Sequence, residues 1–281
     1  MNQTIQTQAD WPTARKNILD FSHFYLVGIK GVAMTSLAQC LLDAGKTVRG
    51  SDVAESFVTQ PLLKKRGLVE HIDTSFSQPL PKDTQCVVYT SAHGAQHNPQ
   101  VEAAKSAGIP VFTQAEAIAS MANTKKIIAV CGVGGKSTVS AMITWILTQL
   151  EMNISYSVGV GDIPGLPATG RWSDESEYFV VEADEYVTEP QEARNGQHHV
   201  PRFAYLNPTI IVCTNLQFDH PDVYTDFEHT KQTYTRFLKK AQNNTGYLVI
   251  NGDDSALVSL AENISVPKTT FGTTQSNEWV I

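Results

Sequence analysis

A glycine-rich turn followed by a lysine and two hydroxyl residues is the segment of this 281-residue chain best suited to chemistry. An apolar stretch over residues 126–131 leads into the turn, and an amphipathic stretch over residues 139–150 follows it. Glycines let backbone N–H groups approach a polyphosphate, a helix N-terminus adds partial positive charge, a lysine adds a full charge, and a serine can hold Mg²⁺. The sequence therefore predicts a phosphate-binding loop for ATP or GTP made of Gly132, Val133, Gly134, Gly135, Lys136, Ser137 and Thr138.

The spacing of this loop differs from the common phosphate-binding motif, in which a further glycine stands five residues before the Gly-Lys pair. Val130 occupies that place here, and the nearest upstream glycine is Gly132. A glycine-rich turn between a strand and a helix, with a lysine present by chance, is the alternative that the local sequence leaves open.

Acidic residues and a histidine follow two further predicted strands. The strand over residues 178–181 ends at Glu182-Ala183-Asp184-Glu185, and the strand over residues 209–214 is followed by Asn215 and Asp219-His220. The carboxyl ends of parallel strands meet at one edge of a sheet, so these groups are placed to bind Mg²⁺ and to position phosphates. Taken singly, Glu182 could serve a helix cap and His220 could be structural, but three such features in one series favour a joint site.

A second glycine turn near the N-terminus reads Gly28-Ile29-Lys30-Gly31-Val32-Ala33. Compared with the dinucleotide-binding pattern, Lys30 replaces the middle glycine and Ala33 the last one. Asp52 ends the next strand, where a ribose-binding carboxylate would stand. This turn suggests a nucleotide-type ligand, NAD included, and a purely structural tight turn remains an alternative.

Two consecutive series of alternating strands and helices predict an α/β protein with mostly parallel sheets. In the first series we expect strands over 23–29, 47–50, 85–90 and 109–112 and helices over 32–44 and 99–107; in the second we expect strands over 127–130, 178–181, 209–214 and 247–250 and a helix over 227–241. We therefore predict a Rossmann-like domain over 1–122 and a P-loop-type α/β domain over 123–281. Residues 189–202 are polar and predict a surface insertion, and we do not expect its His198-His199 pair to bind metal.

Composition excludes several classes of function. The net charge is −7 and no basic stripe is present, which argues against a nucleic-acid partner. No apolar run approaches the roughly 18 residues needed to span a bilayer, and residues 1–20 lack a hydrophobic signal core, so we expect a cytoplasmic protein without a membrane partner. The four cysteines are far apart and contain no Cys-x-x-Cys pair, which predicts buried thiols.

Together these motifs resemble the Mur ligases, an ATP-dependent family that adds amino acids to the peptidoglycan precursor. The resemblance covers about residues 23–273, and it rests on the segment 24–52, on Thr90-Ser91-Ala92 with Asn98-Pro99, on Ile109-Pro110-Val111, on the glycine-rich loop, on Glu182-Ala183-Asp184-Glu185, on Thr214-Asn215 with Asp219-His220, and on Asn251-Gly252-Asp253-Asp254. Val133 and Ser137 depart from the family's loop, in which threonines are usual, and Gly134 replaces a histidine common in the alanine-adding branch.

The resemblance implies a reaction and a role for each residue. The γ-phosphoryl group of ATP passes to the carboxylate of UDP-N-acetylmuramate and leaves ADP, and the amine of L-alanine attacks the resulting acyl phosphate and releases phosphate. The first domain is expected to bind the UDP-sugar through Gly28, Gly31, Ser51, Asp52 and Ser91. The central domain is expected to bind ATP through Gly132–Thr138 and Asn215 and to use Lys136, Glu182 and His220 as catalytic residues. Ser137 and Glu182 are expected to hold one Mg²⁺, and Glu182 and His220 a second.

Three alternatives remain open within and beyond this resemblance. Glu185-Tyr186 leans towards the branch of the family that attaches a preformed tripeptide, whereas Asn207-Pro208 with Thr214-Asn215 leans back towards the alanine-adding branch. A family member continues into a third domain, so we expect the central domain to be incomplete at its C-terminal end. The chain would then be either a fragment or a short protein that takes a separate C-terminal lobe from a partner chain. A non-catalytic UDP-sugar-binding module and an NAD oxidoreductase are the remaining hypotheses, and the second leaves Lys136, Glu182 and His220 unexplained.

Overall fold

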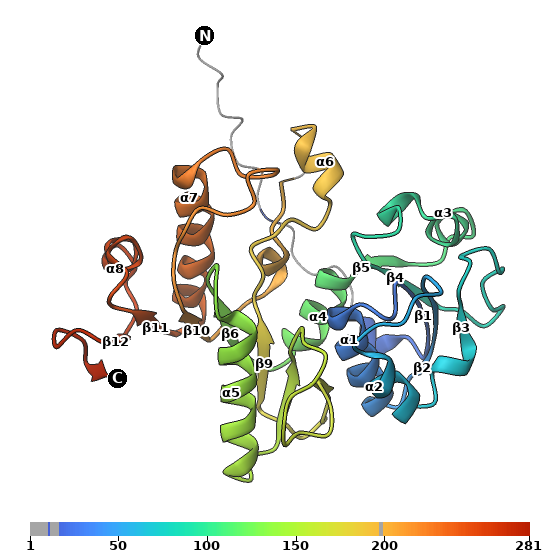
Figure 1. The fold of residues 1–281 in the computed structure, drawn as a ribbon, viewed down its shortest axis with the longest axis horizontal. Helices are drawn as coiled ribbons and strands as arrows, with labels where there is room; N and C mark the ends of the chain where they lie inside the picture. Colours follow the sequence, from blue (N-terminus) through green and yellow to red (C-terminus); the bar gives the residue numbers. More distant parts are fainter. Residues whose placement is uncertain (1–10, 12–16, 197–198) are drawn as a thin grey trace.

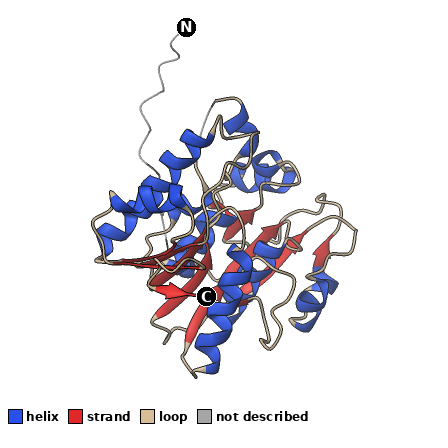
Figure 2. Ribbon diagram, turned by 60° about the vertical axis from the view of Figure 1, so that its left-hand side comes forward, coloured by secondary structure: helices blue, strands red, loops and turns tan. Residues whose placement is uncertain are grey.

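The computed structural model describes residue 11 and residues 17–196 and 199–281, which form two sheets covered by helices (Figure 1). The polar N-terminal segment therefore lies largely outside the described residues, as does His198. Figure 1 shows the two sheets side by side with α1 and α4 between them, and Figure 2 shows helices packed on the outside of the sheets. Within the described part of the chain, no helix is both long and apolar enough to cross a bilayer.

The first sheet has five parallel strands in the order β3-β2-β1-β4-β5. Its strands are β1 (His23–Val27), β2 (Thr47–Ser51), β3 (Ile72–Asp73), β4 (Cys86–Tyr89) and β5 (Val111–Thr113), and its helices are α1 (Val32–Asp43), α2 (Gln60–Lys65), α3 (Pro99–Ser106) and α4 (Gln114–Ala122). The chain adds strands outwards on both sides of a central β1, and this strand order is that of a Rossmann-like half. The expected Rossmann-like α/β architecture is confirmed.

The second sheet has eight strands in the order β13-β12-β11-β10-β6-β9-β7-β8. Its strands are β6 (Lys126–Cys131), β7 (Ile154–Ser157), β8 (Gly170–Arg171), β9 (Tyr178–Glu182), β10 (Ile210–Cys213), β11 (Tyr247–Asn251), β12 (Lys268–Gly272) and β13 (Trp279–Val280), and its helices are α5 (Lys136–Gln149), α6 (Pro190–Arg194), α7 (Phe227–Leu238) and α8 (Ser255–Glu262). All pairs are parallel except β7 with β8. The carboxyl ends of β6, β9 and β10 therefore lie together, as the α/β prediction requires.

The hairpin of β7 and β8, which the sequence did not predict, joins the second sheet to α1 of the first. Gln39 on α1 accepts hydrogen bonds from the backbone N–H of Thr169 and of Gly170 at 3.1 and 2.8 Å. Gly170 lies so close to α1 that a Cβ there would meet the backbone oxygen of Ser36 at 2.0 Å. The two sheets thus share an interface in which backbone approaches backbone, and one apolar cluster includes residues of both.

The helix α4 follows β5 and also contacts the turn η4 (Arg202–Tyr205) of the second half. Asn123, just after α4, donates from its side chain to the backbone oxygen of Tyr205 at 2.9 Å. The boundary between residues 122 and 123 therefore falls within a packed region, and it stays a prediction.

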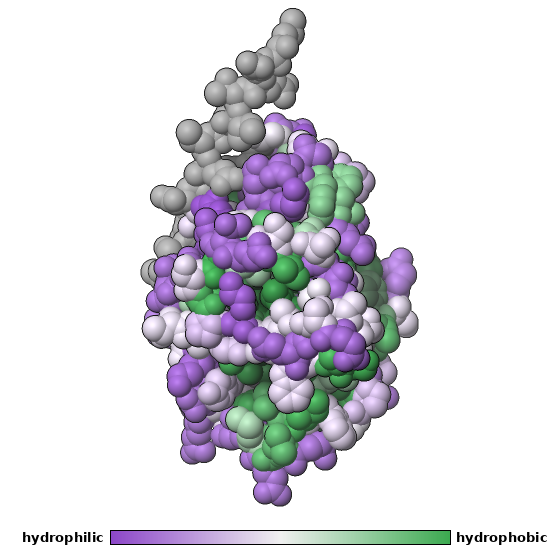
Figure 3. Space-filling model, turned by 90° about the vertical axis from the view of Figure 1, so that its left-hand side faces the viewer, coloured by the Kyte–Doolittle hydropathy of each residue, from purple (hydrophilic) through white to green (hydrophobic). Residues whose placement is uncertain are grey.

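One face of the surface is mixed in hydropathy (Figure 3), and the cysteine thiols lie in the interior. Figure 3 shows one face of the molecule, on which hydrophilic and hydrophobic residues are interspersed. The four cysteines are free and buried, as expected. Burial also raises the pKa of the Cys86 thiol to about 12, so this group stays protonated.

Candidate functional site

The glycine-rich loop connects β6 to α5, and the end of β10 holds its backbone. Asn215 accepts hydrogen bonds at its Oδ1 from the backbone N–H groups of Val133 and Gly134, at 2.8 and 3.0 Å. The backbone at Gly132 has a φ of +124°, and a Cβ there would lie 2.1 Å from Thr214 Oγ1. Only glycine fits this position without displacing its neighbours. Gly134 and Gly135 are exposed, so this part of the loop is open to a ligand.

Lys136 begins α5 and pairs with Glu185, which follows β9. Its ammonium donates to both carboxylate oxygens of Glu185, at 3.0 and 2.8 Å. The two side chains are 12% and 2% exposed. Burial lowers the pKa of Lys136, but the charge and hydrogen bonds of Glu185 outweigh it, so this pKa lies above its ordinary value. The lysine is therefore held charged at the mouth of the loop.

Ser137, the next residue, contacts Glu182 at the end of β9. Its hydroxyl donates to Glu182 Oε1 at 2.9 Å, and the backbone N–H of Gly159 donates to Oε2 at 3.1 Å. Burial raises the pKa of Glu182, and these two hydrogen bonds partly offset that effect. A hydroxyl and a carboxylate oxygen at one point are the hard donors that Mg²⁺ prefers.

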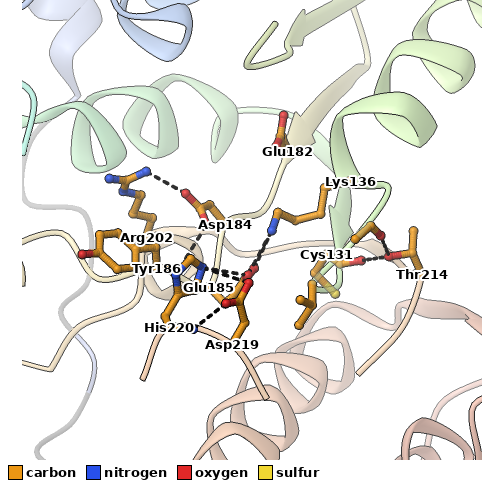
Figure 4. Close-up of polar contacts among 12 residues, drawn as sticks. Cys131, Lys136, Glu182, Asp184, Glu185, Tyr186, Arg202, Thr214, Asp219 and His220 are labelled. Carbon is orange, nitrogen blue, oxygen red and sulfur yellow. Dashed lines mark hydrogen bonds and ion pairs between the residues drawn. The ribbon is translucent and has the colours of Figure 1, made fainter. Parts of the chain in front are cut away.

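His220 contacts Glu185 and Asp219 (Figure 4). Its Nε2 lies 3.5 Å from Glu185 Oε1 and 3.8 Å from Asp219 Oδ2. One ligand atom from each of these three residues lies within 4.8 Å of the others, which is close enough for a shared cation. The hydrogen bond to Glu185 raises the pKa of His220. Sequence reasoning grouped His220 with Glu182, but Figure 4 shows Glu182 lying apart from it, and Glu185 is the acid that joins Lys136 to His220.

Arg202 is a functional candidate that sequence reasoning missed. Its NH1 donates to Asp184 Oδ2 at 2.6 Å and its NH2 donates to Ser91 Oγ at 3.0 Å. Burial raises the pKa of Asp184, but the positive charges of Arg202 and Lys136 outweigh it, and this pKa lies below its ordinary value. Arg202 comes from the polar insertion, which returns to the site because Val187 pairs with Pro201 in an antiparallel bridge. Sequence signals gave no sign of that return.

Two of the residues proposed to bind the sugar nucleotide are fully buried. Ser51 donates to Gln100 Oε1 at 2.6 Å, and Asp52 accepts the backbone N–H of Lys30 at 2.6 Å. Gly28 has a φ of +87° and lies against Thr90, while Gly31 caps the start of α1. Ligand contacts by Gly28, Gly31, Ser51, Asp52 and Ser91 therefore stay predictions.

A cavity of about 140 Å³ lies between the two halves of the molecule. Its lining includes Val32 and Ala33 at the start of α1, Gln114 on α4, and Glu182, Asp184 and Arg202 from the second half. The cavity therefore connects the glycine turn of the first half to the acidic ends of β9.

The chain is similar to one known protein family along most of its length. Residues 23–126 match the profile described as the Mur ligase family, catalytic domain, and residues 130–281 match the Mur ligase middle domain. The chain belongs to the Mur ligase family. The resemblance that the motifs suggested is thereby confirmed.

Relatives within the Mur ligase family are similar along most of this chain. A protein from Acetivibrio thermocellus named UDP-N-acetylmuramate–L-alanine ligase is 32% identical over 265 residues, which are 93% of this chain and 52% of the relative. A protein of the same name from Caldicellulosiruptor saccharolyticus is 33% identical over 260 residues, covering 91% of this chain and 52% of that relative. This Mur ligase chain thus spans about half the length of the curated relatives it matches.

Solved structures support the Mur ligase fold. A UDP-N-acetylmuramate:L-alanyl-γ-D-glutamyl-meso-diaminopimelate ligase from Neisseria meningitides matches with a TM-score of 0.75 at 22% identity, over 92% of this chain and 79% of that one. A UDP-N-acetylmuramate-alanine ligase from Thermotoga maritima matches with a TM-score of 0.70 at 21% identity, over 91% of this chain and 53% of that one.

Proposed function

We propose that this chain supplies the sugar-nucleotide and ATP lobes of an ATP-dependent ligase that joins L-alanine to UDP-N-acetylmuramate through an acyl phosphate, in peptidoglycan precursor synthesis. The names of the two relatives described above support this substrate pair. The observation that carries the proposal is the juxtaposition of an open glycine loop with Lys136, held by Glu185, and Ser137, held by Glu182.

The loop and Lys136 would bind the triphosphate. Phosphoryl transfer needs mainly positioning and neutralisation of charge. The exposed backbone of Gly134 and Gly135 faces the ligand, and the ammonium of Lys136 is already charged and oriented. Asn215 fixes the loop through two backbone N–H groups, so that it is pre-organised for ATP. On binding, the phosphates would accept hydrogen bonds that the ammonium of Lys136 now donates to Glu185.

The donor chemistry of the site fits Mg²⁺. Ser137 and Glu182 would hold one ion, and His220, with Glu185 and Asp219 beside it, would serve a second such ion. When bound, the ions neutralise phosphate charge. The relatives are about twice as long as this chain, so we propose that a C-terminal lobe, beyond the residues of this sequence, helps to bind the amino acid.

A preformed peptide in place of L-alanine is a second candidate, because Tyr186 lines the same site. Its ring centroid lies 4.7 Å from that of His220, and the Arg202 guanidinium lies 5.4 Å from its centroid. An aromatic face here would pack against a ligand larger than alanine. ADP formation with alanine and with tripeptide, measured after addition of a C-terminal lobe, distinguishes the two.

The proposal is tested with Lys136→Ala. We expect the affinity for MgATP to fall about 100-fold or more, because a charged hydrogen-bond donor to phosphate is lost, while the affinity for UDP-N-acetylmuramate stays within about 2-fold. Isothermal titration of the chain with each ligand measures both. Lys126→Ala is the matched control, because Lys126 is exposed and pairs with Glu177 away from the loop.

Unchanged MgATP affinity in Lys136→Ala would refute the nucleotide site. Binding of the UDP-sugar without ADP formation, even with L-alanine and a C-terminal lobe present, would instead support the non-catalytic module.

A further inference from the structure

Arg202 carries the one positive charge among the described residues that line the cavity between the two halves. Glu182 and Asp184 line the same cavity and carry negative charge. An anionic group that entered this space would be repelled by both acids, and Arg202 is the lining residue that could attract it.

The backbone holds Arg202 in place at the edge of the cavity. Its N–H donates to the backbone oxygen of Tyr186 at 2.9 Å, next to the bridge between Val187 and Pro201. Asp184 and Ser91 each occupy one terminal nitrogen of the guanidinium, and its side chain is 30% exposed. A guanidinium has five N–H donors in a planar fork, so these two contacts orient the group and leave donors for a ligand.

The position of Arg202 matches the path of the proposed substrate. A sugar nucleotide bound at the glycine turn of residues 28–31 must reach the site of phosphoryl transfer beside Glu182. The cavity spans this path, because Val32 and Ala33 line one side and Glu182 lines the other. Arg202 also contacts Ser91, a residue that the resemblance to the family implicates in sugar-nucleotide binding.

We propose that Arg202 recognises the carboxylate of the sugar nucleotide and thereby sets the preference for an acidic sugar over a neutral one. Asp184 and Ser91 act as positioning residues that orient its guanidinium. This inference rests on the proposed function, since it assumes a UDP-sugar ligand. It assigns a specificity role to the polar insertion, which contributes Arg202.

The test compares two ligands that differ by one carboxylate-bearing group. UDP-N-acetylmuramate carries a lactyl carboxylate that UDP-N-acetylglucosamine lacks. By isothermal titration, we expect the wild-type chain to prefer the acidic ligand, and we expect Arg202→Gln to weaken that ligand alone by about 10- to 100-fold, the effect of a charge-assisted hydrogen bond. Arg194→Gln is the matched control, because Arg194 lies in the same insertion and pairs with Asp222 but does not line the cavity.

Each other outcome overturns the inference. Equal weakening of both ligands makes Arg202 a structural link between the halves, and an unchanged preference removes its role in recognition. A wild-type chain that binds both ligands equally also contradicts the inference while leaving the proposed function in place, whereas one that binds neither refutes the proposed function itself. Should Arg202→Gln fail to fold, Arg202→Lys keeps the charge, and complete loss of preference in that variant contradicts the proposal.

Discussion

Each half of the molecule has a glycine turn with a lysine, and the two lysines are used differently. Lys30 is 4% exposed, and its ammonium donates to the backbone oxygens of Val53 and Glu55 at 2.6 and 2.9 Å. Lys136 donates to the carboxylate of Glu185. The ammonium of Lys30 links its own turn to the backbone of residues 53–55. The ammonium of Lys136 is bound by a side chain, Glu185, which a ligand could replace as its partner.

The backbones of the two turns differ in the same way. Asp52, fully buried, accepts the N–H of Lys30, so the first turn is closed by an internal carboxylate. Asn215, a neutral amide, holds the second turn, and Gly134 and Gly135 remain exposed. The carboxylate of Asp52 uses up a backbone donor of the first turn, whereas the neutral amide of Asn215 leaves the helix N-terminus at the second turn free to attract phosphate. Similar sequence patterns therefore support different uses.

Gly132→Ala is expected to cause the largest loss of stability among the substitutions that distinguish the two turns. The added Cβ would lie 2.1 Å from Thr214 Oγ1 at a φ of +124°, so we expect a loss of roughly 4 kcal/mol of stability, from steric overlap and backbone strain together. Gly31→Ala is the control, because the nearest atom is 3.5 Å away and its φ is −58°, and it should cost less than about 1 kcal/mol. Urea unfolding measures both, and equal losses would contradict the distinction.

Glu185→Gln tests whether a bound phosphate can replace Glu185 as the partner of Lys136. Removing one partner of a buried ion pair typically costs about 3 kcal/mol or more, and we expect a loss of that size without nucleotide. MgATP should raise the melting temperature of the variant more than that of the wild type, because phosphate replaces the missing charge. Glu177→Gln breaks the exposed pair with Lys126 and should change stability by about 0.5 kcal/mol or less.

A smaller response to MgATP in the Glu185 variant than in the wild type would show that Glu185 itself is needed for nucleotide binding.

Lys30→Met should have a smaller effect that does not depend on nucleotide. The variant keeps the length of the side chain but leaves the oxygens of Val53 and Glu55 without this donor, which we expect to cost about 1–2 kcal/mol. The rise in melting temperature with MgATP should equal that of the wild type. A changed affinity for the UDP-sugar would instead show that Lys30 contacts the ligand.

The sequence predicted the strands and loops that carry the site because these features are local. The apolar strand before Gly132 and the acids after Tyr178–Val181 follow from short patterns, and parallel pairing then brings them to one edge. The sequence assigned Ser137 and Glu182 to one metal site, and in the structure Ser137 Oγ lies 2.9 Å from Glu182 Oε1. The helix α5 begins at Lys136, where the left-handed Gly135 ends the loop.

The features that the sequence did not reveal depend on contacts between distant segments. Glu185 stands three residues after Glu182, and nothing local shows which of the two acids faces Lys136. The strand Ile154–Ser157 is short and half polar, yet its serines are buried against α1 and the neighbouring loops. Arg202 lies in a polar insertion whose return to the site requires the pairing of Val187 with Pro201. Such placements are tertiary and have no period in the sequence.

The smallest expected effect is a pH dependence at His220, which contacts the acid that holds Lys136. The hydrogen bond to Glu185 raises the pKa of His220 above its ordinary value of 6.5, so the native state binds more protons than the unfolded chain. The resulting stabilisation is fully present below pH 6.5 and is lost as the pH rises through the raised pKa. We expect less than about 1 kcal/mol, because the ring is partly exposed. We would measure the unfolding free energies of the wild type and of His220→Gln across this pH range. The two values should converge as the pH rises. A constant difference would show that Glu185 holds Lys136 alone and that His220 titrates independently of the ion pair.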